Sequence, residues 1–106
     1  MSDLLETIEI ETAPAPTTAI IWLHGLGADG HDFEPIVPEL GLPKSTAVRF
    51  IFPHAPVRPV TINGGARMRA WYDVTGDGQQ DAAGIRASQV HVEALIAREL
   101  ARGIPA

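Results

Sequence analysis

The residues best suited to do chemistry lie in one glycine-rich turn, His24-Gly25-Leu26-Gly27-Ala28-Asp29-Gly30. This turn directly follows residues 20–23, an all-apolar run that is typical of a buried strand. A glycine-rich turn after a strand can present its backbone N–H groups to an anion or to a developing negative charge. We therefore expect the functional site of this chain to lie at this turn.

Two motif patterns match the turn at once. Gly25, Gly27 and Gly30 satisfy the G-x-G-x-x-G pattern of dinucleotide-binding loops. Residues 24–27 satisfy the H-G-x-G pattern of the oxyanion loops of serine esterases. The two patterns predict different ligands, a pyrophosphate in the first case and the oxyanion of an acyl-transfer reaction in the second.

The surrounding sequence favours the oxyanion interpretation. A dinucleotide loop needs its third glycine inside the start of a helix and an acidic side chain about 20 residues on, at the end of the next strand. Here Asp32 and Pro35 place the helix after the glycines, and no Asp or Glu lies between Glu39 and Asp73. An oxyanion hole asks only for a tight loop that directs one N–H at the carbonyl oxygen.

The elements that position the turn follow an α/β pattern. Residues 4–11 alternate in polarity and predict a strand with one wet face near a sheet edge, and residues 18–23 predict a central strand. Asp32 is the expected cap of a short helix that Pro38 limits. A third strand is expected at residues 48–52, so the strand–helix–strand order implies a right-handed parallel crossover.

The second half of the chain is expected to hold a long loop and a long helix. Residues 57–78 have no regular pattern, and the aromatic pair Trp71-Tyr72 indicates an ordered, functional loop. Residues 81–102 predict an amphipathic helix that ends at Gly103. The apolar residues expected near one face of that helix are Ile85, Val92, Leu95, Ile96 and Leu100.

Composition narrows the class of protein. The chain has 106 residues, of which 45% are hydrophobic and 20% are charged, as in a globular domain. A net charge of −5 with scattered basic residues argues against a nucleic-acid partner. The absence of cysteine excludes a thiolate nucleophile and a disulfide framework. We find no signal-peptide pattern and no apolar run long enough to span a membrane, so we predict a cytoplasmic location.

Four segments together resemble the N-terminal half of the phospholipase/carboxylesterase family, which includes the acyl-protein thioesterases. They are residues 20–30, 33–40, 52–63 and 68–73, and they occur in the family's order and spacing. The resemblance implies an α/β-hydrolase fold, here the N-terminal portion of a mainly parallel sheet with flanking helices. It also implies a serine hydrolase of carboxylic esters or thioesters, with no cofactor and no metal. Short-chain esters, lysophospholipids and acyl-protein thioesters fit equally as substrates, and the oligomeric state stays open.

The resemblance carries over only part of a catalytic site. It implies that Leu26 contributes one oxyanion-hole N–H, and that Leu26 and the loop from Pro59 to Trp71 line an acyl-binding groove. The family's Ser nucleophile lies in a G-x-S-x-G elbow. None of the serines of this chain lies in such an elbow; they are Ser2, Ser45 and Ser88.

We therefore expect residues 1–106 to form a single incomplete α/β-hydrolase domain, cut before the nucleophile strand and inactive alone. The alternative is a non-catalytic binding module, or a half-domain that needs a partner. A dinucleotide-binding fragment is the third interpretation.

The histidines have structural interpretations beside the chemical ones. His24 could join His31 and Asp32 in a zinc site, but a hydrogen-bonded, structural His24 is the favoured interpretation because zinc needs three or four well-placed ligands. Asp29 and His31 are expected to stabilise the turn. His54, at the end of the third strand, is expected to fix a loop rather than to act as a base.

Overall fold

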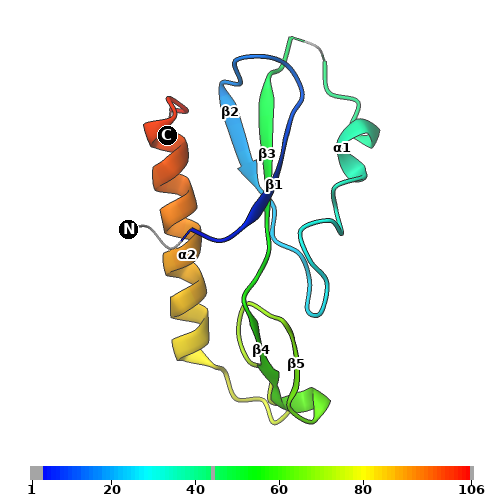
Figure 1. Cartoon of the computed structure of the whole chain (residues 1–106), viewed down its shortest axis with the longest axis vertical. Helices are drawn as coiled ribbons and strands as arrows, with labels where there is room; N and C mark the ends of the chain where they lie inside the picture. The colour runs from blue at the N-terminus through cyan, green and yellow to red at the C-terminus, as the bar shows by residue number, and fades with distance from the viewer. Residues whose placement is uncertain (1–3, 44, 106) are drawn as a thin grey trace.

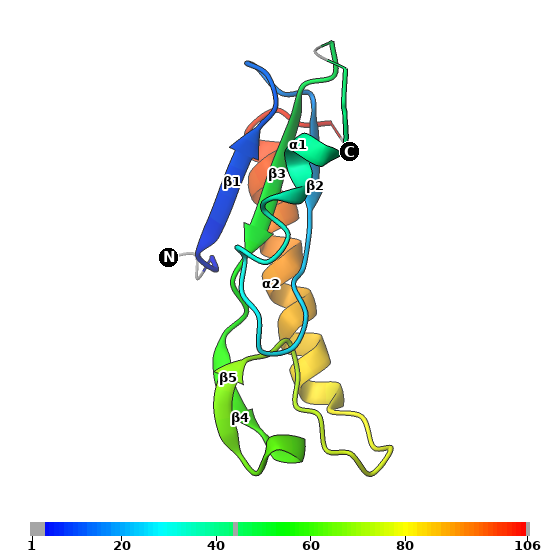
Figure 2. The ribbon, with the colours of Figure 1, turned by 90° about the vertical axis from the view of Figure 1, so that its right-hand side faces the viewer.

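The computed structural model describes residues 4–43 and 45–105, and it confirms the α/β prediction. A three-stranded sheet lies between a short helix, α1, and a long helix, α2, while a separate two-stranded hairpin extends beyond the carboxyl end of β3 (Figures 1 and 2). The elements, in chain order, are β1 (Thr7–Glu11), β2 (Thr18–Ile21), α1 (Ile36–Glu39), β3 (Val48–Pro53), β4 (Val57–Val60), the 3-10 helix η1 (Thr61–Asn63), β5 (Ala66–Arg69) and α2 (Ala82–Ala101).

The strand order of the sheet is β1-β3-β2. β1 runs antiparallel to β3, with Ile10 opposite Phe50, and β2 runs parallel to β3, with Ile20 opposite Phe50. The edge position predicted for β1 is thereby confirmed. Among the described strands β3 is the middle one and β2 pairs on one side only, so the central position predicted for residues 18–23 stays a prediction. Consistently, every residue of β3 except Arg49 is buried, whereas Ile20 of β2 is 39% exposed.

The hydrophobic core lies on the α1 side of the sheet. Val48, Phe50 and Phe52 project to this side from alternate positions of β3 and pack against Val37 of α1. Ile8 and Ile10 of β1, together with Trp22 and Phe33, complete this cluster. The alternation that predicted one apolar face for β1 is confirmed, because Ile8 and Ile10 are the residues that face the core.

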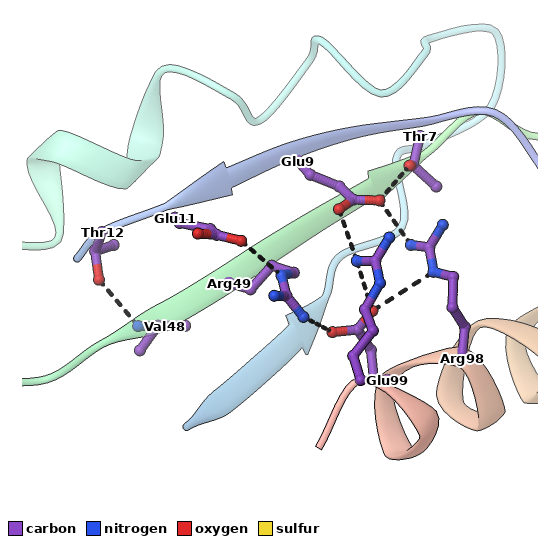
Figure 3. Close-up of polar contacts among 9 residues, drawn as sticks. Thr7, Glu9, Glu11, Thr12, Val48, Arg49, Arg98 and Glu99 are labelled. Atoms are coloured by element: carbon purple, nitrogen blue, oxygen red, sulfur yellow. Dashed lines mark hydrogen bonds and ion pairs between the residues drawn. The ribbon is translucent and has the colours of Figure 1, made fainter. Parts of the chain in front are cut away.

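Charged side chains join the opposite side of the sheet to α2 (Figure 3). Arg49 of β3 contacts Glu99 of α2 at 2.5 Å and Glu11 of β1 at 2.9 Å. Glu9 of β1 contacts Arg98 at 2.7 Å and Arg102 at 2.8 Å. The face of β1 that was expected to be wet is exposed at Glu9 and Glu11, and Glu9 carries the ion pairs to α2.

The predicted long helix is present as α2. Asp81 caps it, since its carboxylate accepts a hydrogen bond from the Gly84 N–H at 3.0 Å, and Gly103 follows it with a φ of 96°. The predicted buried face is wrong in part, because Ile85, Ile96 and Leu100 are 40–48% exposed. The buried residues of α2 are Gly84, Ser88, Leu95 and Glu99.

Two local predictions need correction. The short helix α1 begins after Pro35 and has no side-chain cap, so Asp32 is not its cap. Residues 57–78 are not irregular throughout, because β4 and β5 pair as an antiparallel hairpin. Pro59 obscured this strand in the sequence, since proline lacks an N–H, but both strands of a two-stranded sheet are edges and tolerate it.

Candidate functional site

The glycine-rich turn leaves the sheet at the carboxyl end of β2. β2 and β3 are parallel, so the turn lies beside the segment that follows β3. In parallel α/β sheets the carboxyl ends of the strands are the usual place for a binding site. The structure therefore brings residues 24–30 to the location expected of a functional loop.

His24 anchors the start of this turn and is only 4% exposed. Its Nδ1 lies 2.7 Å from the Gly25 carbonyl oxygen, and its Nε2 accepts a hydrogen bond from the Ala55 N–H at 3.0 Å. Both contacts are satisfied by a neutral ring with the proton on Nδ1. The structural interpretation of His24 is confirmed, because backbone groups occupy both ring nitrogens.

Gly27 shapes the middle of the turn. Its φ of 77° lies in the left-handed region that favours glycine, and its N–H donates to the Arg69 carbonyl oxygen of β5 at 2.9 Å. The Ala28 N–H turns back to the Gly25 carbonyl oxygen at 3.2 Å. Within residues 4–43 and 45–105, no acceptor is found for the N–H groups of Gly25 and Leu26. These two N–H groups are therefore available to a ligand.

Trp71 closes one side of the turn. Its Nε1–H donates to the His24 carbonyl oxygen at 2.9 Å, and its ring lies 5.2 Å from the His24 ring. A pocket of about 180 Å³ opens between these groups, lined by His24, Gly25, Leu26, Trp71, Tyr72 and Val74. The structure thus brings together Leu26 and Trp71, the two residues that the sequence singled out.

Of the residues that line this pocket, Tyr72 was expected with Trp71 in an ordered, functional loop. Val74 carried no signal in the sequence. Asp73 lies between them, and its carboxylate accepts hydrogen bonds from the N–H and the hydroxyl of Thr61 at 2.8 and 2.6 Å. These bonds lower the pKa of Asp73 and tie the pocket wall to η1. Only the folded chain shows the contact between Thr61 and Asp73, because the sequence around each of these residues has no regular pattern.

Asp29 and His31 stabilise the turn, as expected. The Asp29 carboxylate accepts a hydrogen bond from the His31 N–H at 2.8 Å, and this bond is the main reason that the pKa of Asp29 is lowered. The His31 ring contacts Glu34 at 2.8 Å. In the described residues, no three His, Asp or Glu side chains are grouped as a metal ion would require. The His24, His31 and Asp32 set does not form a zinc site here.

The serines that the structure describes do not form a nucleophile elbow. Ser88 is buried in α2, and its hydroxyl donates to the Trp71 carbonyl oxygen. Ser45 lies in a turn before β3, and Ser2 lies outside the described residues. Ser88 therefore supports the wall of the pocket through the Trp71 carbonyl oxygen.

A larger apolar groove adjoins the pocket along α2. It has a volume of about 560 Å³ and shares Trp71 and Tyr72 with the smaller pocket. Its apolar lining comes from Leu23 after β2 and from Ile85, Val92 and Ile96 of α2. This groove accounts for the apolar stripe of α2 that the sequence predicted to be buried.

Comparison with known proteins agrees with this architecture. The sequence profile of the Phospholipase/Carboxylesterase family matches residues 5–106. The chain belongs to this family. Its fold is therefore the N-terminal portion of the α/β-hydrolase fold. In a dinucleotide-binding loop the third glycine lies at the start of the helix, whereas here helix α1 begins at Ile36, well after Gly30.

Relatives in the family are considerably longer than this chain. Acyl-protein thioesterase 1 of Neurospora crassa is 39% identical over 85% of the chain and 40% of its own length. Acyl-protein thioesterase 1 of Yarrowia lipolytica is 38% identical over 93% of the chain and 46% of its own length. The crystal structure of Zea mays acyl-protein thioesterase 2 superposes with a TM-score of 0.74 at 34% identity, covering 87% of the chain and 40% of that structure. The chain thus spans less than half of the relatives it matches.

No helix in the described part of the chain combines the length and the apolar character needed to cross a bilayer.

Proposed function

We propose that this chain is the N-terminal part of a serine hydrolase that cleaves carboxylic esters or thioesters. The observation that carries the proposal is the geometry of the H-G-x-G turn. The turn lies at the carboxyl end of a parallel strand, and the Leu26 N–H, for which the described residues offer no acceptor, lies beside an apolar pocket. Such a loop suits the developing oxyanion of acyl transfer.

In this mechanism Leu26 acts through its backbone. A serine hydroxyl attacks the acyl carbon, the carbonyl oxygen becomes negatively charged, and the Leu26 N–H donates to it. A second N–H follows the nucleophile, as in other α/β-hydrolases. The nucleophile and its Asp and His partners would come from polypeptide beyond these 106 residues, since no serine of this sequence lies in a G-x-S-x-G elbow.

The pocket favours an acyl group as the bound part of the substrate. The side chains of Leu26 and Trp71 offer apolar surface next to the proposed oxyanion site. This chemistry needs no cofactor and no metal. The names of the two fungal relatives and of the maize structure favour a thioester substrate. We place the reaction in the cytoplasm, the location predicted from the sequence.

The domain boundary forms part of the proposal. The groove along α2 exposes Ile85 by 40% and Ile96 by 46%, and β2 pairs with one neighbour only among the described strands. Large exposed apolar patches mark surfaces that other polypeptide covers. We therefore take residues 1–106 as an incomplete hydrolase domain. The intact mass of the natural product tests this, because a mass equal to that of the 106 residues would favour the binding-module alternative.

The decisive experiment compares Leu26→Pro with Leu26→Ala in the protein as its gene encodes it. Proline removes the N–H, whereas alanine keeps it and changes only the side chain. We expect Leu26→Pro to lower kcat for a p-nitrophenyl ester by about 100-fold or more, as for other lost oxyanion donors. Leu26→Ala is expected to act mainly on KM. Equal kcat values for the two variants, with both proteins folded, would reject the role of Leu26.

A second measurement addresses the activity itself. The protein as encoded is expected to hydrolyse the ester and to be titrated by a fluorophosphonate, which labels activated serines. The isolated 106 residues are expected to show neither property. Turnover by the isolated chain that survives repurification and is abolished by the fluorophosphonate would contradict the proposal.

A further inference from the structure

The end of the glycine-rich turn is held by a second histidine. The Gly30 N–H donates a hydrogen bond to Nδ1 of His54 at 2.9 Å, and Gly30 is buried. A Cβ atom at Gly30 would lie 2.5 Å from the Phe52 carbonyl oxygen and 3.1 Å from Cε1 of His54. Glycine is therefore required here, because the turn lies directly against the end of β3.

His54 is itself firmly placed. Its N–H donates to the Glu6 carbonyl oxygen at 2.9 Å, which ties it to the segment before β1. Its ring lies 5.7 Å from the His31 ring, on the far side of the turn. Since Nδ1 accepts the Gly30 bond, it carries no proton, and the neutral ring holds its proton on Nε2. The bond to Gly30 therefore exists only while His54 is neutral.

Charged groups from three neighbouring segments face this ring. Burial is the main cause that lowers the pKa of His54 below its usual value of 6.5, and Arg69 of β5 and His31 act in the same direction. Asp29 of the turn and Glu6 before β1 act in the opposite direction. The lowered pKa means that the folded chain holds the neutral ring more strongly than the unfolded chain does.

We propose that His54 is the positioning residue of the oxyanion loop, and that protonation of its ring releases the end of that loop and weakens the reaction. A protonated Nδ1 would direct an N–H at the N–H of Gly30, so the bond cannot form. The stabilising contribution of the neutral ring is complete above pH 6.5 and is lost as the pH falls through the lower pKa of the folded state. The inference rests on the proposed function, in which residues 24–30 hold the Leu26 N–H.

The experiment uses the protein as encoded and four variants, of which His31→Asn tests the neighbouring ring. His54→Asn keeps an acceptor at the position of Nδ1 but does not titrate, and His54→Leu removes the acceptor. His91→Asn makes the same chemical change on α2, away from the turn. The Gly30 amide is followed by ¹⁵N NMR and hydrogen exchange between pH 4.5 and 8, and kcat is measured over the same range.

We expect the Gly30 amide of the unmodified protein to lose protection on acidification together with the titration of the His54 ring, and kcat to fall with the same midpoint. His54→Asn should keep the Gly30 amide protected and should remove the part of the acid limb that follows the Gly30 titration, leaving the part that belongs to the proposed catalytic histidine. His54→Leu should leave the amide unprotected at every pH and lower kcat by about 10- to 100-fold, the range expected when a catalytic group is misplaced by about 1 Å. His91→Asn should behave as the unmodified protein.

Three results would overturn the inference. The first is an unchanged Gly30 amide in His54→Leu, and the second is a fall of kcat at the midpoint of the Gly30 titration that persists in His54→Asn. The third is a Gly30 titration abolished by His31→Asn, which would assign the effect to His31. If His54→Leu does not fold, the pH dependence of the Gly30 amide and of kcat in the unmodified protein and in His54→Asn still tests the inference. If the NMR results are as expected but no ester is hydrolysed, the proposed function fails while the role of His54 in placing the loop stands.

Discussion

On the α1 side of the sheet, Phe50 and Phe52 are buried among other apolar side chains, whereas on the α2 side the Arg49 side chain, 13% exposed, contacts Glu99 and Glu11. The stability that the apolar side contributes depends on the apolar area removed from water, so it tolerates small shifts of the packed side chains. The charged side depends on partners at fixed distances, because an unpaired buried charge is costly. The same strand thus supplies only apolar contacts on the α1 side, and both the buried Ile51 and the paired Arg49 on the α2 side.

The buried face of α2 carries charged contacts to the sheet. Glu99 is 4% exposed and is reached by three arginines, Arg49 at 2.5 Å, Arg102 at 3.0 Å and Arg98 at 3.5 Å. Bonds to Glu99 and Glu11 raise the pKa of Arg49 above its usual value. The buried face of α2 thus combines Glu99 with Leu95, the residue of the apolar stripe that is 0% exposed. Other residues of the stripe lie along the groove beside Trp71, where the proposed remainder of the enzyme would cover them.

The largest effect is expected on the apolar side. Phe50 is 0% exposed, so Phe50→Ala should lower the free energy of unfolding by about 3–5 kcal/mol. The loss comes from the transfer of the ring and from the cavity that remains. Urea unfolding measures it. A loss below about 1 kcal/mol would mean that the two sides of the sheet do not differ as described.

Replacing Glu99 on the charged side should lower the free energy of unfolding slightly less than Phe50→Ala does. Glu99→Ala leaves Arg49 with only Glu11 as a partner, and we expect a loss of about 3 kcal/mol, the lower end for a broken buried pair. The paired variant Arg49→Met with Glu99→Met should recover most of that loss, because apolar residues can replace a buried pair. A double variant no more stable than Glu99→Ala would show that the contact is not mainly electrostatic.

Acidification should weaken the charged side before the apolar side. Burial alone would raise the pKa of Glu9, but hydrogen bonds from Arg102 and Thr7 and the charges of Arg98 and Arg102 lower it below 4.5. Its contribution to stability is complete above pH 4.5 and is lost as the pH falls through the lower folded value. Glu9→Gln should therefore flatten the fall of Tm below pH 4.5. An identical pH profile in both proteins would remove Glu9 from the explanation.

The smallest effect is expected on the exposed stripe of α2. In the isolated chain, Ile96→Ser should change the free energy of unfolding by no more than about 0.5 kcal/mol, as for other surface substitutions. In the protein as encoded, Ile96→Ser should lower the free energy of unfolding by about 1–3 kcal/mol if further polypeptide buries Ile96. Val90→Ser is the matched control, because Val90 is 64% exposed and does not line the groove. Equal losses for the two variants in the encoded protein would argue against the proposed cover.

Much of the site could be predicted from the residues because its signals are local. The glycine-rich turn, the parallel strand before it and the long capped helix each depend on residues close together in sequence. The meeting of Leu26 and Trp71 was implied by resemblance to the family, and the pocket confirms that they are neighbours. Their proposed roles in oxyanion and acyl binding stay predictions.

Other features involve residues that are distant in sequence. The hairpin of β4 and β5 was hidden by Pro59, and the sequence did not show that α2 buries Leu95 but exposes other residues of its apolar stripe. The bond between Gly30 and His54 joins positions 24 residues apart. No periodic pattern identifies such a pair, because each partner follows the geometry of its own segment.

The sequence alone determined the α/β order of elements, the family, the turn that can bind an oxyanion and the absence of a nucleophile elbow from these residues. These depend on residue type and short-range spacing, which limit the backbone directly. Only the tertiary structure decided that β3 is the middle strand, that Glu99 is buried, and that His54 holds Gly30. Each of these depends on which distant groups satisfy one another once water is excluded, and local spacing does not contain that information.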